Sequence, residues 1–171
     1  SRSGLGTDDA ARLVRLGVAA GRIEVTGDPR FDSALRRARA VPREHPLRQY
    51  CRGAPTLVAG STWSEDEAVV LRAYASVRAV RPDARLVVVP HEPTPGRLDA
   101  VDRAARGSGL PNPLRLGSGG AAEGGDVLVV DRTGVLPVFY ADAAIAYVGG
   151  GLGSRGLHSV LEPAAAGVPV L

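Results

Sequence analysis

Residues 56–89 read TLVAGSTWSEDEAVVLRAYASVRAVRPDARLVVV, and this stretch decides the fold class. An apolar run at 56–59 is followed by a helical pattern at 65–80 and a second apolar run at 85–89. Neither run alternates with polar residues, as expected of parallel strands that are buried on both faces. Two such strands joined by a helix form the repeating unit of an α/β sheet, so we expect this fold class.

The same alternation continues to the end of the sequence. We expect a helix at 95–106, a strand at 126–130, a short helix at 135–140, a strand at 144–148, a helix at 158–166 and a last strand from Val168 onward. This order predicts a Rossmann-like, doubly wound parallel sheet. The glycine-rich stretch 117–125 is interpreted as a surface loop.

Upstream of residue 56 the pattern is less regular. A helix at 7–16, a strand at 23–26 and a helix at 31–40 precede a loop at 41–55. We place a domain boundary near Thr26 and expect Asp28, Phe31 and Asp32 to form a hinge with its packing anchor.

Composition excludes several kinds of protein. The single cysteine, Cys51, permits no internal disulfide or cysteine-rich metal cage, and the cytoplasm is the default location. No apolar run approaches the ~20 residues of a membrane span. The sequence begins without methionine and stops in an apolar run, so we expect both ends to be truncations.

The charge balance does not favour nucleic acid as a partner. All 21 basic residues are arginine, and the formal net charge is +3. Nucleic-acid binders typically cluster basic residues on one face, whereas these are scattered. Arg36, Arg37 and Arg39 are interpreted as a solvated helix face.

The first polar turn, at 60–67, leaves the first predicted strand. Ligands of parallel sheets bind beyond the carboxyl ends of the strands, which makes such turns candidate sites. Gly60 would let a ligand approach the backbone, and Ser64 with Glu67 fits a capping box for the next helix. A plain, well-capped turn explains the same residues, and Trp63 suits either the core or a stacking platform.

The second turn holds His91 and Glu92 between Pro90 and Pro93. The prolines restrict the backbone, and a rigid polar pair suits ligand recognition. An ordinary proline-rich turn with a solvent-facing histidine is the alternative.

The third turn is the richest in polar and glycine residues. Glycines after a strand let backbone amides face an anion, and a following helix adds its positive end. Its candidates are Gly149, Gly150, Gly151, Arg155, His158, Ser159 and Glu162. We expect His158 and Glu162 to share one helix face, where the carboxylate could accept ribose hydroxyls. Residues 131–134 could border the same cleft or be an ordinary turn.

In this order, these turns resemble the carboxyl-terminal half of the Kdo transferases, which move 3-deoxy-D-manno-octulosonic acid (Kdo) from CMP-Kdo to lipid A precursor. The matching motifs are TDDAARLVRLGV (7–18), VTGDPRFD (25–32), GSTWSEDE (60–67), PHEP (90–93) and YVGGGLGSRGLHSVLEPAAAGVPVL (147–171). The last motif is the most specific. A glutamate-proline before a small-residue helix is shared by the wider glycosyltransferases with two Rossmann domains (GT-B), whereas the glycine pair combined with His-x-x-x-Glu-Pro resembles the Kdo transferases more narrowly.

The resemblance implies a donor site for CMP-Kdo. Its residues would be Gly60, Ser61, Glu65, Pro90, His91, Glu92, Gly149, Gly150, Gly151, Arg155, His158, Ser159 and Glu162. Three positions depart from the family pattern. His91 stands where many members have arginine, Ser159 stands where asparagine is usual, and residues 131–134 replace Asp-Thr-Met-Gly. Arg155 is a candidate to replace the missing arginine contact to the donor phosphate.

The resemblance also implies how the chain divides. Residues 1–26 would be the tail of an N-terminal acceptor domain with its linker, and residues 27–171 a nucleotide-sugar-binding GT-B domain, truncated at its end. The family's catalytic glutamate base lies in the N-terminal domain, so no catalytic residue is assigned and the fragment is expected to be inactive. No metal or cofactor is implied, and the intact family members sit peripherally on the cytoplasmic face of the bacterial inner membrane.

Two other readings remain open. The non-hydrolysing UDP-sugar 2-epimerases share the fold and a similar glutamate-proline region. A stand-alone nucleotide-binding module is the third possibility. Preference for UDP over CMP would favour the epimerases.

Overall fold

The computed structural model describes residues 2–4, 6–117 and 125–171, and within them the main sheet has five parallel strands. Their order is β5–β6–β4–β3–β7. The strands are β3 (Thr56–Thr62), β4 (Arg85–Pro90), β5 (Pro113–Arg115), β6 (Val127–Val129) and β7 (Ile145–Val148). The predicted α/β class with a parallel sheet is confirmed.

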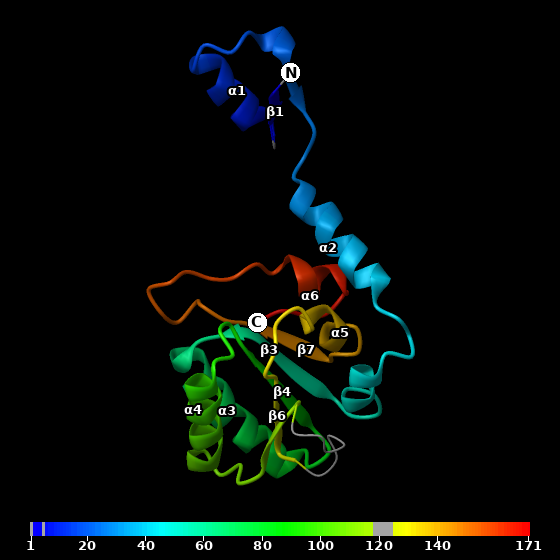
Figure 1. Cartoon of the computed structure of the whole chain (residues 1–171), viewed down its shortest axis with the longest axis vertical. Coiled ribbons are helices and arrows are strands. Elements are labelled where there is room, and N and C mark those ends of the chain that lie inside the picture. The colour runs from blue at the N-terminus through cyan, green and yellow to red at the C-terminus, as the bar shows by residue number, and fades with distance from the viewer. Residues whose placement is uncertain (1, 5, 118–124) are drawn as a thin grey trace.

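Helices cover both faces of this sheet (Figure 1). One face carries α3 (Ser64–Val80) and α4 (Pro95–Gly107), and the other carries α5 (Leu136–Tyr140), α6 (Leu161–Ala165) and the 3-10 helix η2 (Pro46–Tyr50). Successive residues of a strand point to opposite faces. In β4, Leu86 and Val88 accordingly pack under α3 and α4, while Val87 and Val89 join the core on the other side. The doubly wound arrangement follows from this two-sided burial.

Helix α2 (Pro29–Ala40) packs against α6 and α5. It begins two residues before the predicted start, because the Asp28 side chain accepts a hydrogen bond of 2.9 Å from the Arg30 amide and proline suits the first helical position. The prediction that Phe31 is a packing anchor is wrong for this chain, because this residue is 56% exposed. Ala34 is the buried residue of the helix.

A second, smaller unit precedes α2. Strands β1 (Arg2–Gly4) and β2 (Ile23–Val25) pair in parallel, joined by α1 (Thr7–Arg15) and a 3-10 turn, η1 (Ala20–Arg22). Figure 1 shows this unit apart from the main sheet, with α2 leading from one to the other. The separation falls at the predicted boundary, and the assignment of the two parts to two domains of a longer enzyme stays a prediction.

The sequence predictions differ from the structure at two strands of the main sheet and at one helix beside it. Strand β5 was not predicted. It lies at the edge of the sheet, where a proline such as Pro113 is tolerated although it has no amide donor, and the apolar pattern does not reveal such a strand. The last strand is reduced to one bridge between Ala146 and Val170. The helix expected at 158–166 begins only at Leu161. In the predicted loop 117–125, residues 118–124 lie outside the described residues.

Candidate functional site

The first and third predicted turns lie side by side at the carboxyl edge of the sheet. Strand β3 pairs with β7, and the register places Gly60 opposite Val148. The Gly149 amide then donates to the Gly60 carbonyl at 2.9 Å. Chain connections run outward in opposite directions from β3 and β7, which makes this the switch point where parallel sheets bind ligands.

Asp66 fastens these two turns together, and sequence reasoning missed it. Its side chain is 1% exposed and accepts three hydrogen bonds, from the Trp63 amide (2.8 Å), the Tyr147 hydroxyl (2.8 Å) and the Gly150 amide (2.9 Å). A buried carboxylate is tolerated when donors surround it in this way. The glycine-rich turn is therefore held by a carboxylate of α3.

The start of α3 explains why the predicted capping box is wrong. Trp63 is the N-cap, so the third helical position, which reaches back to the cap amide, is Asp66 and not Glu67. Glu67 is buried instead, accepting from the Thr62 hydroxyl at 2.9 Å and from Arg97 at 2.5 Å. Burial raises the pKa of Glu67, and Arg97 and Thr62 oppose that shift.

The glycines of these turns serve protein packing. A Cβ at Gly60 would lie 2.9 Å from Leu136 Cδ2, so the space beside Gly60 is filled and not left for a ligand. A Cβ at Gly149 would lie 2.8 Å from Thr62 Cα. The expectation that the Gly149 and Gly150 amides face an anion is wrong, because Gly60 and Asp66 already accept their hydrogen bonds.

Ser61 adopts a backbone conformation that is rare for a residue with a side chain. Its φ is +53°, in the left-handed region, where the pairing of β3 with β4 shifts register between Gly60 and Thr62. Such local strain is typical of functional sites. The bulge leaves Ser61 on the wall of a cleft described below.

Three aromatic rings from the three turns form one stack. The His91 and His158 ring centroids are 4.2 Å apart, and Trp63 lies 4.9 Å from His91. Trp63 Nε1–H donates to His158 Nε2 at 3.0 Å, which requires that nitrogen to be unprotonated. Burial and the neighbouring His91 both lower the pKa of His158. Trp63 is thus part of a ring stack within the predicted site.

Arg155 and Glu65 lie at the outer side of this stack. The Arg155 guanidinium sits 4.0 Å from the centre of the Trp63 ring, a cation–π contact. The pKa of Glu65 is lowered mainly by hydrogen bonds from its own amide and from the Ser64 hydroxyl, with a further contribution from Arg155. Neither side chain is among the residues that line the cleft.

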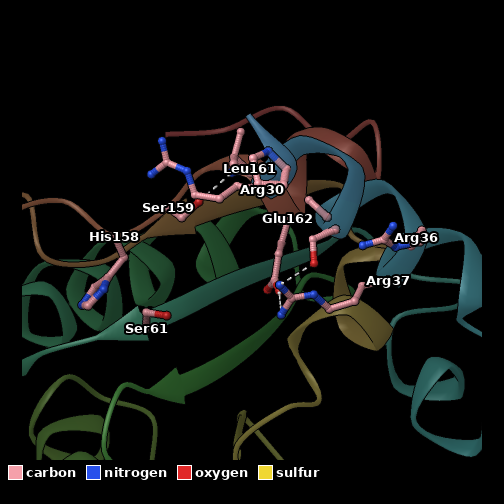
Figure 2. A pocket seen from close by; sticks show the side chains of 11 residues that line it. Arg30, Arg36, Arg37, Ser61, His158, Ser159, Leu161 and Glu162 are labelled. Carbon is pink, nitrogen blue, oxygen red and sulfur yellow. Dashed lines mark hydrogen bonds and ion pairs between the residues drawn. The ribbon is translucent and has the colours of Figure 1, made fainter. Parts of the chain in front are cut away.

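A cleft of about 600 Å³ opens between α2 and the third turn (Figure 2). Four predicted site residues line it: Ser61, His158, Ser159 and Glu162. The opposite wall belongs to α2 and includes Arg30, Arg36 and Arg37. Arg36 and Arg37 are exposed, as predicted for a solvated helix face, and their side chains also border the cleft.

His158 and Glu162 reach this cleft without sharing a helix. The His158 amide closes the glycine-rich turn by donating to the Gly149 carbonyl at 3.0 Å, and α6 begins three residues later, at Leu161. The Ser159 hydroxyl accepts from the Leu161 amide at 3.3 Å, where α6 begins. Glu162 then lies in the first turn of α6, with Oε1 3.0 Å from Arg37 Nη1.

The remaining candidates lie elsewhere. Pro90 pairs with Thr62 at the end of β4, and Glu92 is exposed and does not line the cleft. Asp131 accepts from the Gly117 amide at 2.9 Å and pairs with Arg132, and residues 131–134 do not border the cleft.

Within 2–4, 6–117 and 125–171, no group of three His, Cys, Asp or Glu side chains is placed to hold a metal ion. No helix in these ranges combines the length and apolarity needed to cross a bilayer.

Comparison with known proteins gives sequence and structural relatives. No protein-family model matches. A 3-deoxy-D-manno-octulosonic acid transferase of Bordetella pertussis is 32% identical over 96% of the chain and 38% of its own length. The chain thus spans about a third of the length of the curated relatives with this name.

Two solved structures resemble this chain in fold. The C-terminal CMP-Kdo binding domain of WaaA from Acinetobacter baumannii matches with a TM-score of 0.65 and 25% identity, covering 81% of this chain and 69% of that one. A UDP-GlcNAc 2-epimerase from Neisseria meningitidis matches with a TM-score of 0.50 and 12% identity, over 82% of this chain and 36% of that one. The second likeness is one of fold alone.

Proposed function

Because this chain belongs to the family of the 3-deoxy-D-manno-octulosonic acid (Kdo) transferases, we propose that it is the donor-binding part of a glycosyltransferase that uses CMP-Kdo. Its substrate is a nucleotide-sugar, and no cofactor or metal is required. The observation that carries this proposal is the convergence of Ser61, His158, Ser159 and Glu162 on one cleft at the switch point of the sheet.

The chemistry of the cleft suits a cytidine monophosphate group. The Glu162 carboxylate is an acceptor for ribose hydroxyls, as acidic residues are in dinucleotide folds. Arginines suit phosphate through charge and planar donor geometry. Arg30 and Arg36 stand on the wall of the cleft, whereas Arg155 lies over the Trp63 ring. We therefore favour α2 over Arg155 as the source of the cation that faces the donor phosphate.

In the whole enzyme, a carboxylate base outside this chain would take the proton of an acceptor hydroxyl on lipid A precursor. The oxygen would then form a bond to the anomeric carbon of Kdo as the bond to CMP breaks. Cations of this chain would stabilise the charge on the departing phosphate. The intact enzyme would act peripherally at the cytoplasmic face of the bacterial inner membrane, where such an acceptor is embedded.

Calorimetric titration of the chain with CMP, UDP and ADP tests the donor assignment. We expect CMP to bind most tightly and Glu162→Ala to weaken it by about 10-fold or more, the effect of losing a hydrogen bond to a charged group. Glu24→Ala is the matched control, because Glu24 is an exposed glutamate on β2, in the unit apart from the cleft. It should bind CMP as the unaltered chain does.

Two outcomes would overturn the proposal. A preference for UDP would move the assignment to a UDP-sugar enzyme of the same fold, such as the 2-epimerases. Equal binding of CMP by the Glu162→Ala and Glu24→Ala variants would show that the nucleotide occupies a different place.

A further inference from the structure

One face of α2 is directed at the cleft. Ser33 and Ala34 each lie three or four residues from both Arg30 and Arg37, the spacing that places side chains on one side of a helix. Ala34 is 4% exposed, and α2 makes its main contact with α6. A small side chain at this point lets the two helices approach closely. The longer side chains one turn away then reach the residues of α6.

Arg37 uses this closeness to hold Glu162. Its Nη1 lies 3.0 Å from Glu162 Oε1, and its Nη2 is 3.5 Å from the Ser33 hydroxyl, one turn back on α2. Figure 2 shows the guanidinium and the carboxylate meeting at the cleft, which both residues line. Among the described residues, Arg37 is the one cation paired with Glu162.

The charge of Glu162 also acts on a buried phenol. Tyr140 of α5 is 2% exposed, and burial together with the charge of Glu162 raises its pKa. The Glu162 carboxylate is therefore close enough to this phenol for its charge to be felt, and it is paired with the Arg37 guanidinium. A free glutamate side chain populates several rotamers, and fixing one costs conformational entropy. Arg37 restricts Glu162 before any ligand arrives.

We propose that Arg37 is a positioning residue that orients the Glu162 carboxylate toward the ribose hydroxyls of the bound nucleotide. The inference rests on the proposed function, since it concerns the same ligand. Arg37 acts through Glu162 and not on the phosphate. The side chain of Arg37 is 60% exposed and that of Glu162 is 25% exposed, and ion pairs this accessible contribute little to folding stability. The pair matters for the geometry of binding.

The test compares CMP with 2′,3′-dideoxy-CMP, which keeps the base and phosphate but lacks the hydroxyls that Glu162 would bind. Calorimetry on the full chain should give an affinity for CMP that Arg37→Gln lowers about 5- to 10-fold, with the affinity for the dideoxy nucleotide unchanged. Arg37→Lys should recover part of the loss. The double variant Arg37→Gln/Glu162→Ala should be no weaker than Glu162→Ala alone, because two residues acting as a unit are not additive.

Arg39→Gln is the matched control, because Arg39 is an exposed arginine on the same helix that does not line the cleft. It should leave both affinities unchanged. Equal weakening of both nucleotides by Arg37→Gln would mean that Arg37 contacts the phosphate, and no effect on either would remove it from the site. Either of these two results overturns the inference about Arg37. The proposed function is upheld in both cases, provided that the unaltered chain binds CMP. Absence of CMP binding by the unaltered chain overturns both.

Discussion

Replacing Asp66 should separate the contribution of its charge from that of its hydrogen bonds. Oδ2 accepts from the Trp63 and Gly150 amides, and Oδ1 accepts from the Tyr147 hydroxyl. In Asp66→Asn, the amide oxygen can take the place of Oδ2, and the new NH₂ group faces a hydroxyl that can rotate to accept. All three partners stay paired, and the loss of charge costs about 1–2 kcal/mol of unfolding free energy.

Asp66→Ala should be much more harmful. It leaves two amides without an acceptor, at about 1–3 kcal/mol each, and removes the bond to Tyr147. We expect a loss of about 3–5 kcal/mol, a large share of the ~5–15 kcal/mol by which a domain is stable. Tyr147→Phe removes the hydroxyl and leaves Asp66 Oδ1 without a donor, so it should cost about 1.5–3 kcal/mol, the range for a hydrogen bond to a charged group.

Urea unfolding, followed by circular dichroism and by the fluorescence of Trp63, measures these differences. Trp63 is the single tryptophan and is the N-cap of α3, so its emission also reports whether the turn itself has moved. Equal destabilisation by Asp66→Asn and Asp66→Ala, or a loss below about 1 kcal/mol for Asp66→Ala, would refute the hydrogen-bond argument.

Two further predictions concern the same edge of the sheet. Gly60→Ala should lower the free energy of unfolding in urea by about 1–3 kcal/mol, because its Cβ would press on Leu136. The control is Gly96→Ala in α4, where an added Cβ would have no atom within 4 Å, so this variant should be neutral or slightly stabilising. Equal effects of the two variants would argue against close packing at Gly60. His158 should titrate below its ordinary pKa of 6.5 in an NMR pH series, because burial and His91 disfavour the imidazolium. The unfolded chain then binds this proton more readily, so stability should fall as the pH drops below about 6.5, and His158→Gln should flatten that fall; a titration at or above 6.5 would contradict the assigned cause.

The sequence pattern correctly predicted the strands that consist of buried apolar runs. Buried apolar runs predicted β3, β4 and β7, and the rule that ligands bind beyond parallel strands led to the turns that meet at the cleft. Apolar periodicity is a local signal, and both predictions needed only local signals and a topology rule.

The errors arose where one residue of register or a distant contact decides the outcome. The predicted N-cap, Ser64, and the observed one, Trp63, differ by one residue. With the cap at Trp63, Asp66 is the carboxylate that holds the two turns together, and Glu67 is buried. Arg37 and Glu162 lie 125 positions apart, and each alone reads as an exposed charge on a helix. No local pattern of residues distinguishes a solvated arginine from one that faces a carboxylate across a cleft.

Helix α2 connects the β1–β2 unit to the cleft and also carries Arg37, which gives it the properties of a lever arm. Arg37 follows Pro29 by eight residues, or about 12 Å along a helix that rises 1.5 Å per residue. A tilt of about 10° at the start of α2 would displace that point by about 2 Å, enough to separate a guanidinium from its carboxylate. Rotation of the β1–β2 unit at the start of α2 would therefore displace Arg37 relative to Glu162. A ligand bound in the cleft would in turn exert a force on α2.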